Sequence, residues 1–75
     1  SLLVDLDATI EDKLWQILRS IDERIILLRQ LRDLASTGSD DSTAQEYARQ
    51  IEDAMSRAQA FRQMLQQPAG FRAAP

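Results

Sequence analysis

The chain has 75 residues, a net charge of −3, and neither histidine nor cysteine. A chain of this length forms at most one small domain, and its acidic balance argues against nucleic acid or an anionic membrane as a partner. The absence of cysteine leaves no disulfide and no thiolate metal site, which fits a cytoplasmic protein, and no apolar run is long enough to span a bilayer.

Residues 1–8 are predicted to form an N-terminal lead-in. Its apolar side chains either continue the helix that follows or fold back over it, and they belong to Leu2, Leu3, Val4 and Leu6. The lead-in lacks the basic region and the long apolar stretch of a secretory signal, so we expect no such signal here.

A first helix is predicted from about residue 9 to residue 35, because apolar residues recur there at steps of mostly three and four. Its N-cap candidates are Asp5, Asp7 and Thr9. We expect its buried face to consist of Ile10, Leu14, Ile17, Leu18, Ile21, Ile25, Leu28, Leu31 and Ala35.

This helix is also apolar away from that face. Trp15 and Ile26 lie on one flank of it, and Leu27 and Leu34 lie toward the opposite flank. One neighbouring helix cannot cover both flanks, whereas two or three can, so the pattern predicts a helix bundle. Arg32 falls in the middle of the apolar face, where either its stem snorkels to the end of the bundle or its guanidinium pairs with a carboxylate of the facing helix.

Residues 36–42 are polar and are predicted to form a turn. Gly38 can adopt the left-handed conformation that ends a helix. The candidates for the N-cap of the next helix are Asp40, Asp41, Ser42 and Thr43, and the possible capping boxes are Ser42 with Gln45 and Thr43 with Glu46. Such a short connection makes the two helices antiparallel neighbours.

A second helix is predicted from about residue 43 to residue 67. Its apolar residues follow a strict seven-residue period, which predicts left-handed supercoiling against a partner helix. These residues are Ala44, Tyr47, Ile51, Ala54, Ala58, Phe61 and Leu65. Pro68 and Gly70 then end the helix, and residues 68–75 are predicted to be a flexible tail.

The residue inventory argues against catalysis. Without histidine or cysteine the chain has no Ser-His or Cys-His pair. Adjacent carboxylates, such as Glu11 and Asp12, point about 100° apart on a helix and cannot converge on one metal ion or substrate. We therefore expect no enzymatic activity, no metal and no cofactor.

The fold class predicted from these patterns is all-α, an antiparallel helical hairpin that dimerises into a four-helix bundle. The expected partner is a second copy of the chain. An alternative is a docking module, which binds a receptor, an adaptor or a parent-domain helix in an apolar groove. The residues expected at interfaces are Leu14, Trp15, Leu18, Ile21, Ile25, Ile26, Leu28, Ala44, Tyr47, Ile51, Ala54, Ala58, Phe61 and Leu65.

The run Lys13–Arg32, with Leu14-Trp15 and with Arg19 four residues after the tryptophan, resembles a helical extension in stand-alone CheB-type protein-glutamate methylesterases. That extension follows the catalytic domain, and the segments 47–54 and 58–65 resemble its second half. The resemblance implies a cytoplasmic, C-terminal piece of a larger chemotaxis-like signalling enzyme. The Ser-His-Asp triad of that family lies in the preceding domain, so no catalytic residue transfers to this chain. The implied task is oligomerisation or regulation.

Overall fold

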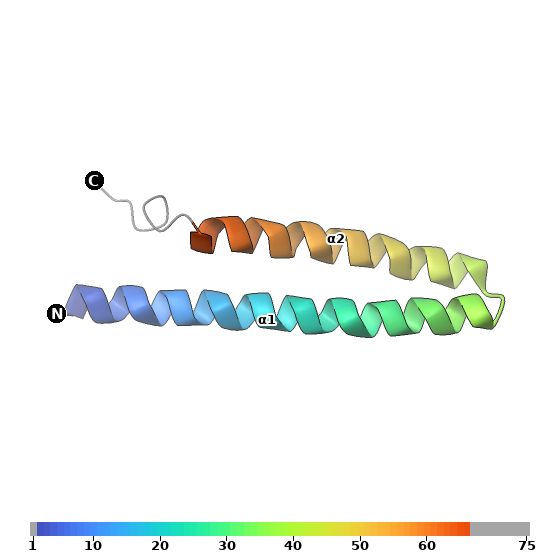
Figure 1. The fold of residues 1–75 in the computed structure, drawn as a ribbon, viewed down its shortest axis with the longest axis horizontal. Coiled ribbons are helices and arrows are strands. Elements are labelled where there is room, and N and C mark those ends of the chain that lie inside the picture. Colours follow the sequence, from blue (N-terminus) through green and yellow to red (C-terminus); the bar gives the residue numbers. More distant parts are fainter. Residues whose placement is uncertain (1, 67–75) are drawn as a thin grey trace.

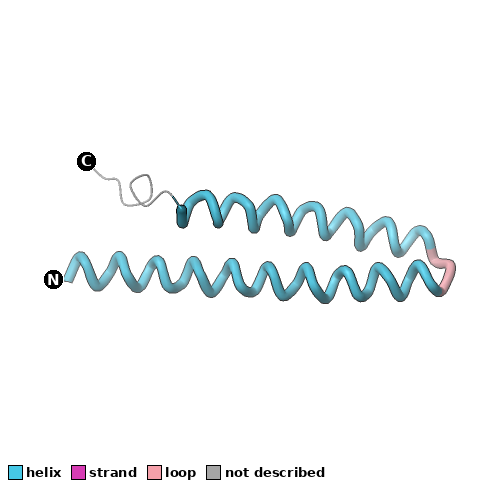
Figure 2. The backbone as a smooth tube through the Cα atoms, viewed as in Figure 1, coloured by secondary structure: helices cyan, strands magenta, loops and turns pink. Residues whose placement is uncertain are grey.

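The structure, a computed structural model, describes residues 2–66, with side chains from residue 8 onward. It contains two helices, α1 (Leu2–Thr37) and α2 (Asp41–Gln66), which run antiparallel side by side (Figure 1). A loop at the far end of the hairpin joins them (Figure 2). This architecture confirms the predicted all-α helical hairpin. The predicted flexible tail, residues 68–75, lies outside the described residues.

Helix α1 begins earlier than the sequence pattern suggested. The structure starts it at Leu2, so the predicted lead-in is part of the helix. The three N-cap candidates (Asp5, Asp7 and Thr9) therefore lie inside the helix and do not begin it. The physical reason is that no proline or glycine precedes Gly38, so nothing in the chain interrupts the helical path. As a result the N-terminal part of α1 extends beyond the end of α2 (Figure 1).

The end of α1 has the hydrogen-bond pattern of a Schellman motif. The amide of Asp40 donates to the carbonyl of Ala35 at 2.9 Å, and the amide of Ser39 donates to the carbonyl of Ser36 at 3.1 Å. The left-handed residue is Ser39, with φ of 61°, and not Gly38 as predicted. The amide of Asp40 makes the last hydrogen bond of α1, and its side chain caps α2. The left-handed residue that turns the chain is therefore the one immediately before Asp40.

Asp40 is the N-cap of α2. Its Oδ1 accepts the amide of Thr43 at 3.2 Å, and its Oδ2 accepts the Thr43 hydroxyl at 2.7 Å. The first intrahelical bond runs from the amide of Ala44 to the carbonyl of Asp40 at 3.0 Å. These hydrogen bonds, led by that from the Thr43 side chain, lower the pKa of the Asp40 carboxyl. The cap is thus the first of the four predicted candidates, and Thr43 acts as its donor and not as a cap itself.

The core is a single seam between the two helices. On α2 the seven positions of the predicted seven-residue repeat are all buried or half-buried. The fully buried ones are Ala44, Ile51, Ala54 and Ala58. Three of these four are alanines with a small side chain, which lets the two backbones approach closely.

On α1 the residues that face α2 also follow a seven-residue repeat. We call this set the inner seam, and it consists of Leu14, Leu18, Ile21, Ile25, Leu28, Arg32 and Ala35, all buried or half-buried. The predicted buried face also included Ile10, Ile17 and Leu31, and this part of the prediction is wrong because these residues are exposed. Each of the three stands one residue before a position of the inner-seam repeat, or before the position where that repeat would continue toward the N-terminus. Its side chain therefore points about 100° away from the direction of α2.

Candidate interaction surface

Large apolar side chains remain in contact with solvent on both flanks of α1. Leu34 is 68% exposed, Leu27 is 59% exposed, Ile26 is 55% exposed and Trp15 is 47% exposed. Large exposed patches of this kind mark interaction sites on soluble proteins. In the hairpin, α2 covers one face of α1 and leaves both flanks open.

The first flank carries a second regular stripe, which we call the outer seam. From Lys13 onward, each residue of the outer seam immediately precedes a residue of the inner seam. The outer seam therefore repeats at the same steps of three and four residues, and it is rotated by about 100° around α1 from the inner seam. Five of its eight positions are apolar. The outer seam consists of Ile10, Lys13, Ile17, Ser20, Arg24, Leu27, Leu31 and Leu34.

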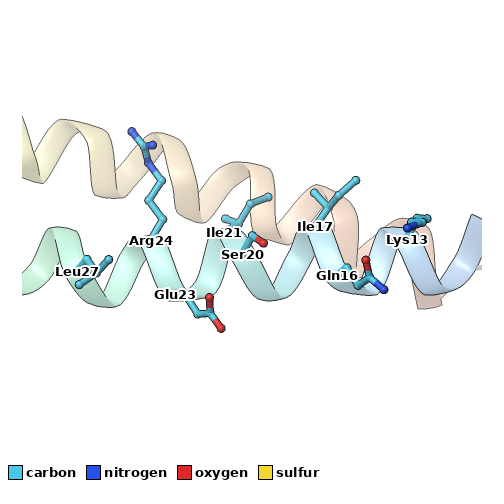
Figure 3. Close-up of a pocket in the computed structure, with 8 residues that line it drawn as sticks. All are labelled: Lys13, Gln16, Ile17, Ser20, Ile21, Glu23, Arg24 and Leu27. Carbon is cyan, nitrogen blue, oxygen red and sulfur yellow. The ribbon is translucent and has the colours of Figure 1, made fainter.

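A shallow hollow lies along the middle of the outer seam. Its lining includes Lys13, Ile17, Ser20 and Leu27, which follow one another along one side of α1 (Figure 3). Glu23 stands at the edge of this hollow and points away from α2. The hollow therefore presents apolar side chains beside isolated charges, which suits a helix and not a small polar ligand.

The opposite flank, which we call the tryptophan flank, is smaller and consists of Trp15, Ile26 and Met55. It includes a hollow between the helices that Ile26, Met55 and Arg29 help to line. The Nη2 atom of Arg29 lies 3.9 Å from the Sδ atom of Met55. A charged group thus stands next to the apolar side chains of this flank.

An ion pair between the two helices was missed by reasoning from the sequence. The Nη2 atom of Arg62 donates to both carboxylate oxygens of Asp22, at 2.8 and 2.9 Å. Spacing rules within one helix cannot connect residues 40 positions apart. Asp22 immediately follows a residue of the inner seam, and Arg62 immediately follows a residue of the seven-residue repeat of α2. Antiparallel helices bring such flanking positions together. Seven residues along, the same register places Arg29 beside Met55.

Arg32 occupies an inner-seam position without a carboxylate partner on α2. Its Nε atom lies 3.5 Å from Oδ1 of Asp33, its neighbour in the same helix, and its side chain is 38% exposed. The alternative of an ion pair with the facing helix is therefore wrong. The arginine replaces an apolar residue in the repeat, so the seam weakens toward the loop.

The charged surface of α2 contains a local ion-pair cluster. Arg49 donates to Glu46 at 2.6 Å and to Asp53 at 3.2 Å. The hydrogen bond from Arg49, followed by that from Gln50, lowers the pKa of Glu46 to about 2. The hydrogen bond from Glu46 in turn raises the pKa of the Arg49 guanidinium. These groups are engaged with one another along a solvated helix face.

The structure divides the predicted interface residues into two groups. One group lies between α1 and α2, buried or half-buried: Leu14, Leu18, Ile21, Ile25, Leu28, Ala44, Tyr47, Ile51, Ala54, Ala58, Phe61 and Leu65. The other group, Trp15 and Ile26, lies on the tryptophan flank and does not enter the seam. The apolar spacing places Leu27 and Leu34 on a flank of α1 but does not reveal the outer seam, because Lys13, Ser20 and Arg24 interrupt its apolar pattern.

Within the described residues, no three carboxylates, histidines or cysteines gather where they could hold a metal ion. Over the same part of the chain, neither helix has a stretch with the length and apolar character needed to cross a membrane. Comparison of the chain with protein-family models, with curated proteins and with solved structures gives no match.

Proposed function

We propose that this hairpin is a non-catalytic oligomerisation module, in which the outer seam of α1 binds a second copy to form a four-helix bundle. The observation that carries the proposal is the exposure of large apolar side chains on α1, foremost Leu27 and Leu34. α2 cannot cover them, because the inner seam already uses the face of α1 that α2 contacts.

The size of the apolar gain supports association. Full burial of one leucine or isoleucine contributes about 1.5–3 kcal/mol, so covering a side chain that is half exposed recovers about 1 kcal/mol. Five apolar outer-seam residues on each of two chains would together contribute about 10 kcal/mol before the entropy cost of association. That amount is comparable with the whole stability of a small domain.

The resemblance to the extension of CheB-type methylesterases gives the proposal a context. In that setting the hairpin would hold two enzyme subunits together or regulate them in the cytoplasm, and the chemistry would belong to another domain. The residues of this chain fit such a division of labour, since the sequence offers neither histidine nor cysteine for nucleophilic catalysis.

Solution mass tests the proposal directly. We expect light scattering on the 75-residue chain to report twice the chain mass, and we expect thermal unfolding to shift to higher temperature as the protein concentration rises. Leu27→Asp should give a helical monomer, because a charge on the outer seam has to be desolvated in the dimer. Ser56→Asp is the matched control, since it adds the same charge to an exposed position of α2. A wild-type chain that stays monomeric at high concentration would refute the proposal.

A docking module is the second candidate. Lys13 and Arg24 stand among the apolar residues of the hollow on α1, and this combination would attract an acidic amphipathic helix of another protein. A wild-type chain that is monomeric and fully helical in solution would favour docking over self-association.

A further inference from the structure

We infer that the outer seam pairs with the outer seam of a second copy, so that the two α1 helices run antiparallel at the centre of the dimer. This inference rests on the proposed self-association through the outer seam and adds to it the orientation and the register of the two helices. Its basis is the self-complementarity of the eight outer-seam positions. Of the nine large apolar side chains that are exposed among the described residues, five belong to this seam.

The register follows from the order of side chains along the seam. In an antiparallel pair, Ile17 of one copy lies level with Leu27 of the second copy, and Ile10 lies level with Leu34. The two-fold symmetry repeats each of these apolar layers on the other side of the centre. At the centre the small Ser20 leaves room for Arg24 of the second copy. A charge also occurs in the layers where Lys13 of one copy lies level with Leu31 of the second copy. There the aliphatic stem of the lysine can lie along the leucine.

Charge complementarity selects this arrangement over its alternatives. In a parallel dimer each position meets itself, so Arg24 would face Arg24 and Lys13 would face Lys13. In the antiparallel register Arg24 shares a layer with Ser20 of the second copy and lies about one turn from both Glu23 and Arg24 of that copy, so the two arginines are offset along the axis and a carboxylate at the edge of the same hollow stands near them. A shift of seven residues in either direction would place Arg24 against Lys13 or against Leu27. The antiparallel orientation also opposes the two helix dipoles.

The geometry of a bundle favours α1 as the shared helix. Inner and outer seams are about 100° apart around α1, which is close to the right angle that two neighbours of one helix subtend in a four-helix bundle. On the same side of the hairpin, α2 presents Gln50, Asp53 and Arg57, which line a small hollow with Arg24. This polar surface of α2 suits the rim of an interface and not its apolar centre.

Disulfide trapping tests the inference, because the natural chain has no cysteine that could interfere. Ile17→Cys and Leu27→Cys are prepared separately, one of them with an affinity tag, at concentrations where light scattering shows the dimer. We expect each variant alone to give no cross-link on oxidation, since a cysteine would lie roughly 15 Å along the axis from its own copy. An equimolar mixture should give a cross-linked heterodimer. Ile10→Cys with Leu34→Cys provides a second, independent pair with the same expectation.

The possible outcomes separate the inference from the proposed function. Cross-linking of Ile17→Cys or Leu27→Cys with itself would mean a parallel dimer and would overturn the antiparallel register. Cross-linking only in a mixture of Trp15→Cys and Ile26→Cys would place the dimer contact on the tryptophan flank, overturning the outer seam while leaving self-association intact. A wild-type chain without any dimer would remove both.

Discussion

Two adjacent leucines of α1 allow the hairpin core and the association surface to be tested separately. Leu28 belongs to the inner seam and is 5% exposed, whereas Leu27 belongs to the outer seam and is 59% exposed. Both are replaced by alanine, so the chemical change and the loss of helix-forming tendency are the same. Any difference between the two variants therefore reports which side of α1 each leucine occupies.

Leu28→Ala is expected to destabilise the hairpin itself by about 2–3 kcal/mol, the lower part of the range for buried leucines, because a seam between only two helices lets solvent fill the space. For a domain of this size the loss lowers the melting temperature by roughly 8–24 °C. Leu27→Ala should cost the isolated hairpin less than about 1 kcal/mol, because more than half of its side chain is already in water.

The assay is thermal unfolding followed by circular dichroism at two protein concentrations, with the mass checked by light scattering. At the low concentration, where monomer predominates, only Leu28→Ala should melt early. At the high concentration Leu27→Ala should lose most of the concentration-dependent increase that the wild type shows. Equal destabilisation of the monomer by both variants would refute the assignment of the inner and outer seams, and no effect of Leu27→Ala at either concentration would count against association through the outer seam.

Three further predictions concern the loop and the ion pairs. Ser39→Gly should stabilise the hairpin by about 1 kcal/mol in urea unfolding, because serine is strained at the positive φ of the turn; a loss of stability would contradict the assigned Schellman motif. Glu46 has a folded pKa of about 2 against an ordinary 4.5, so its stabilising contribution is complete above about pH 4.5 and is lost as the pH falls toward 2. Glu46→Gln should therefore flatten the dependence of melting temperature on pH in that window, and an unchanged slope would show that the Arg49 pair contributes nothing. Asp22→Ala should cost no more than about 1 kcal/mol in urea unfolding, because its ion pair with Arg62 is about two-fifths exposed; a larger loss would mean that this pair fixes the register.

The sequence was most informative where one physical requirement dominates. On α2 every apolar residue of the repeat serves the same contact, so the spacing from Ala44 to Leu65 identified the seven residues that face α1. On α1 two seams share one helix, and their apolar residues overlap in the pattern. Ile17 and Leu18 are adjacent and equally apolar, and only the position of α2 decides that the second is buried and the first is not.

Helix ends were harder to predict because they depend on hydrogen bonds that form only once the neighbouring elements are in place. Gly38 has the lower intrinsic cost for a left-handed conformation, yet the structure assigns that conformation to Ser39. The deciding constraint is Asp40, whose amide closes α1 while its carboxylate begins α2. At the other end of α1, capping residues alone could not mark a start, since the chain before them continues as helix.

The contrast between the two helices has a consequence for how stability and association are coupled. The α2 side of the seam is rich in alanine, and although Ala58 is completely buried, an alanine side chain removes little apolar area from water. The hairpin therefore obtains close backbone packing from α2 but only a thin core. The leucines and isoleucines of α1 that could enlarge this core point to the flanks, where α2 does not reach. In the proposed dimer those side chains would be covered by the second α1, so folding and association would draw on the same helix, and stability would rise with the concentration of the chain.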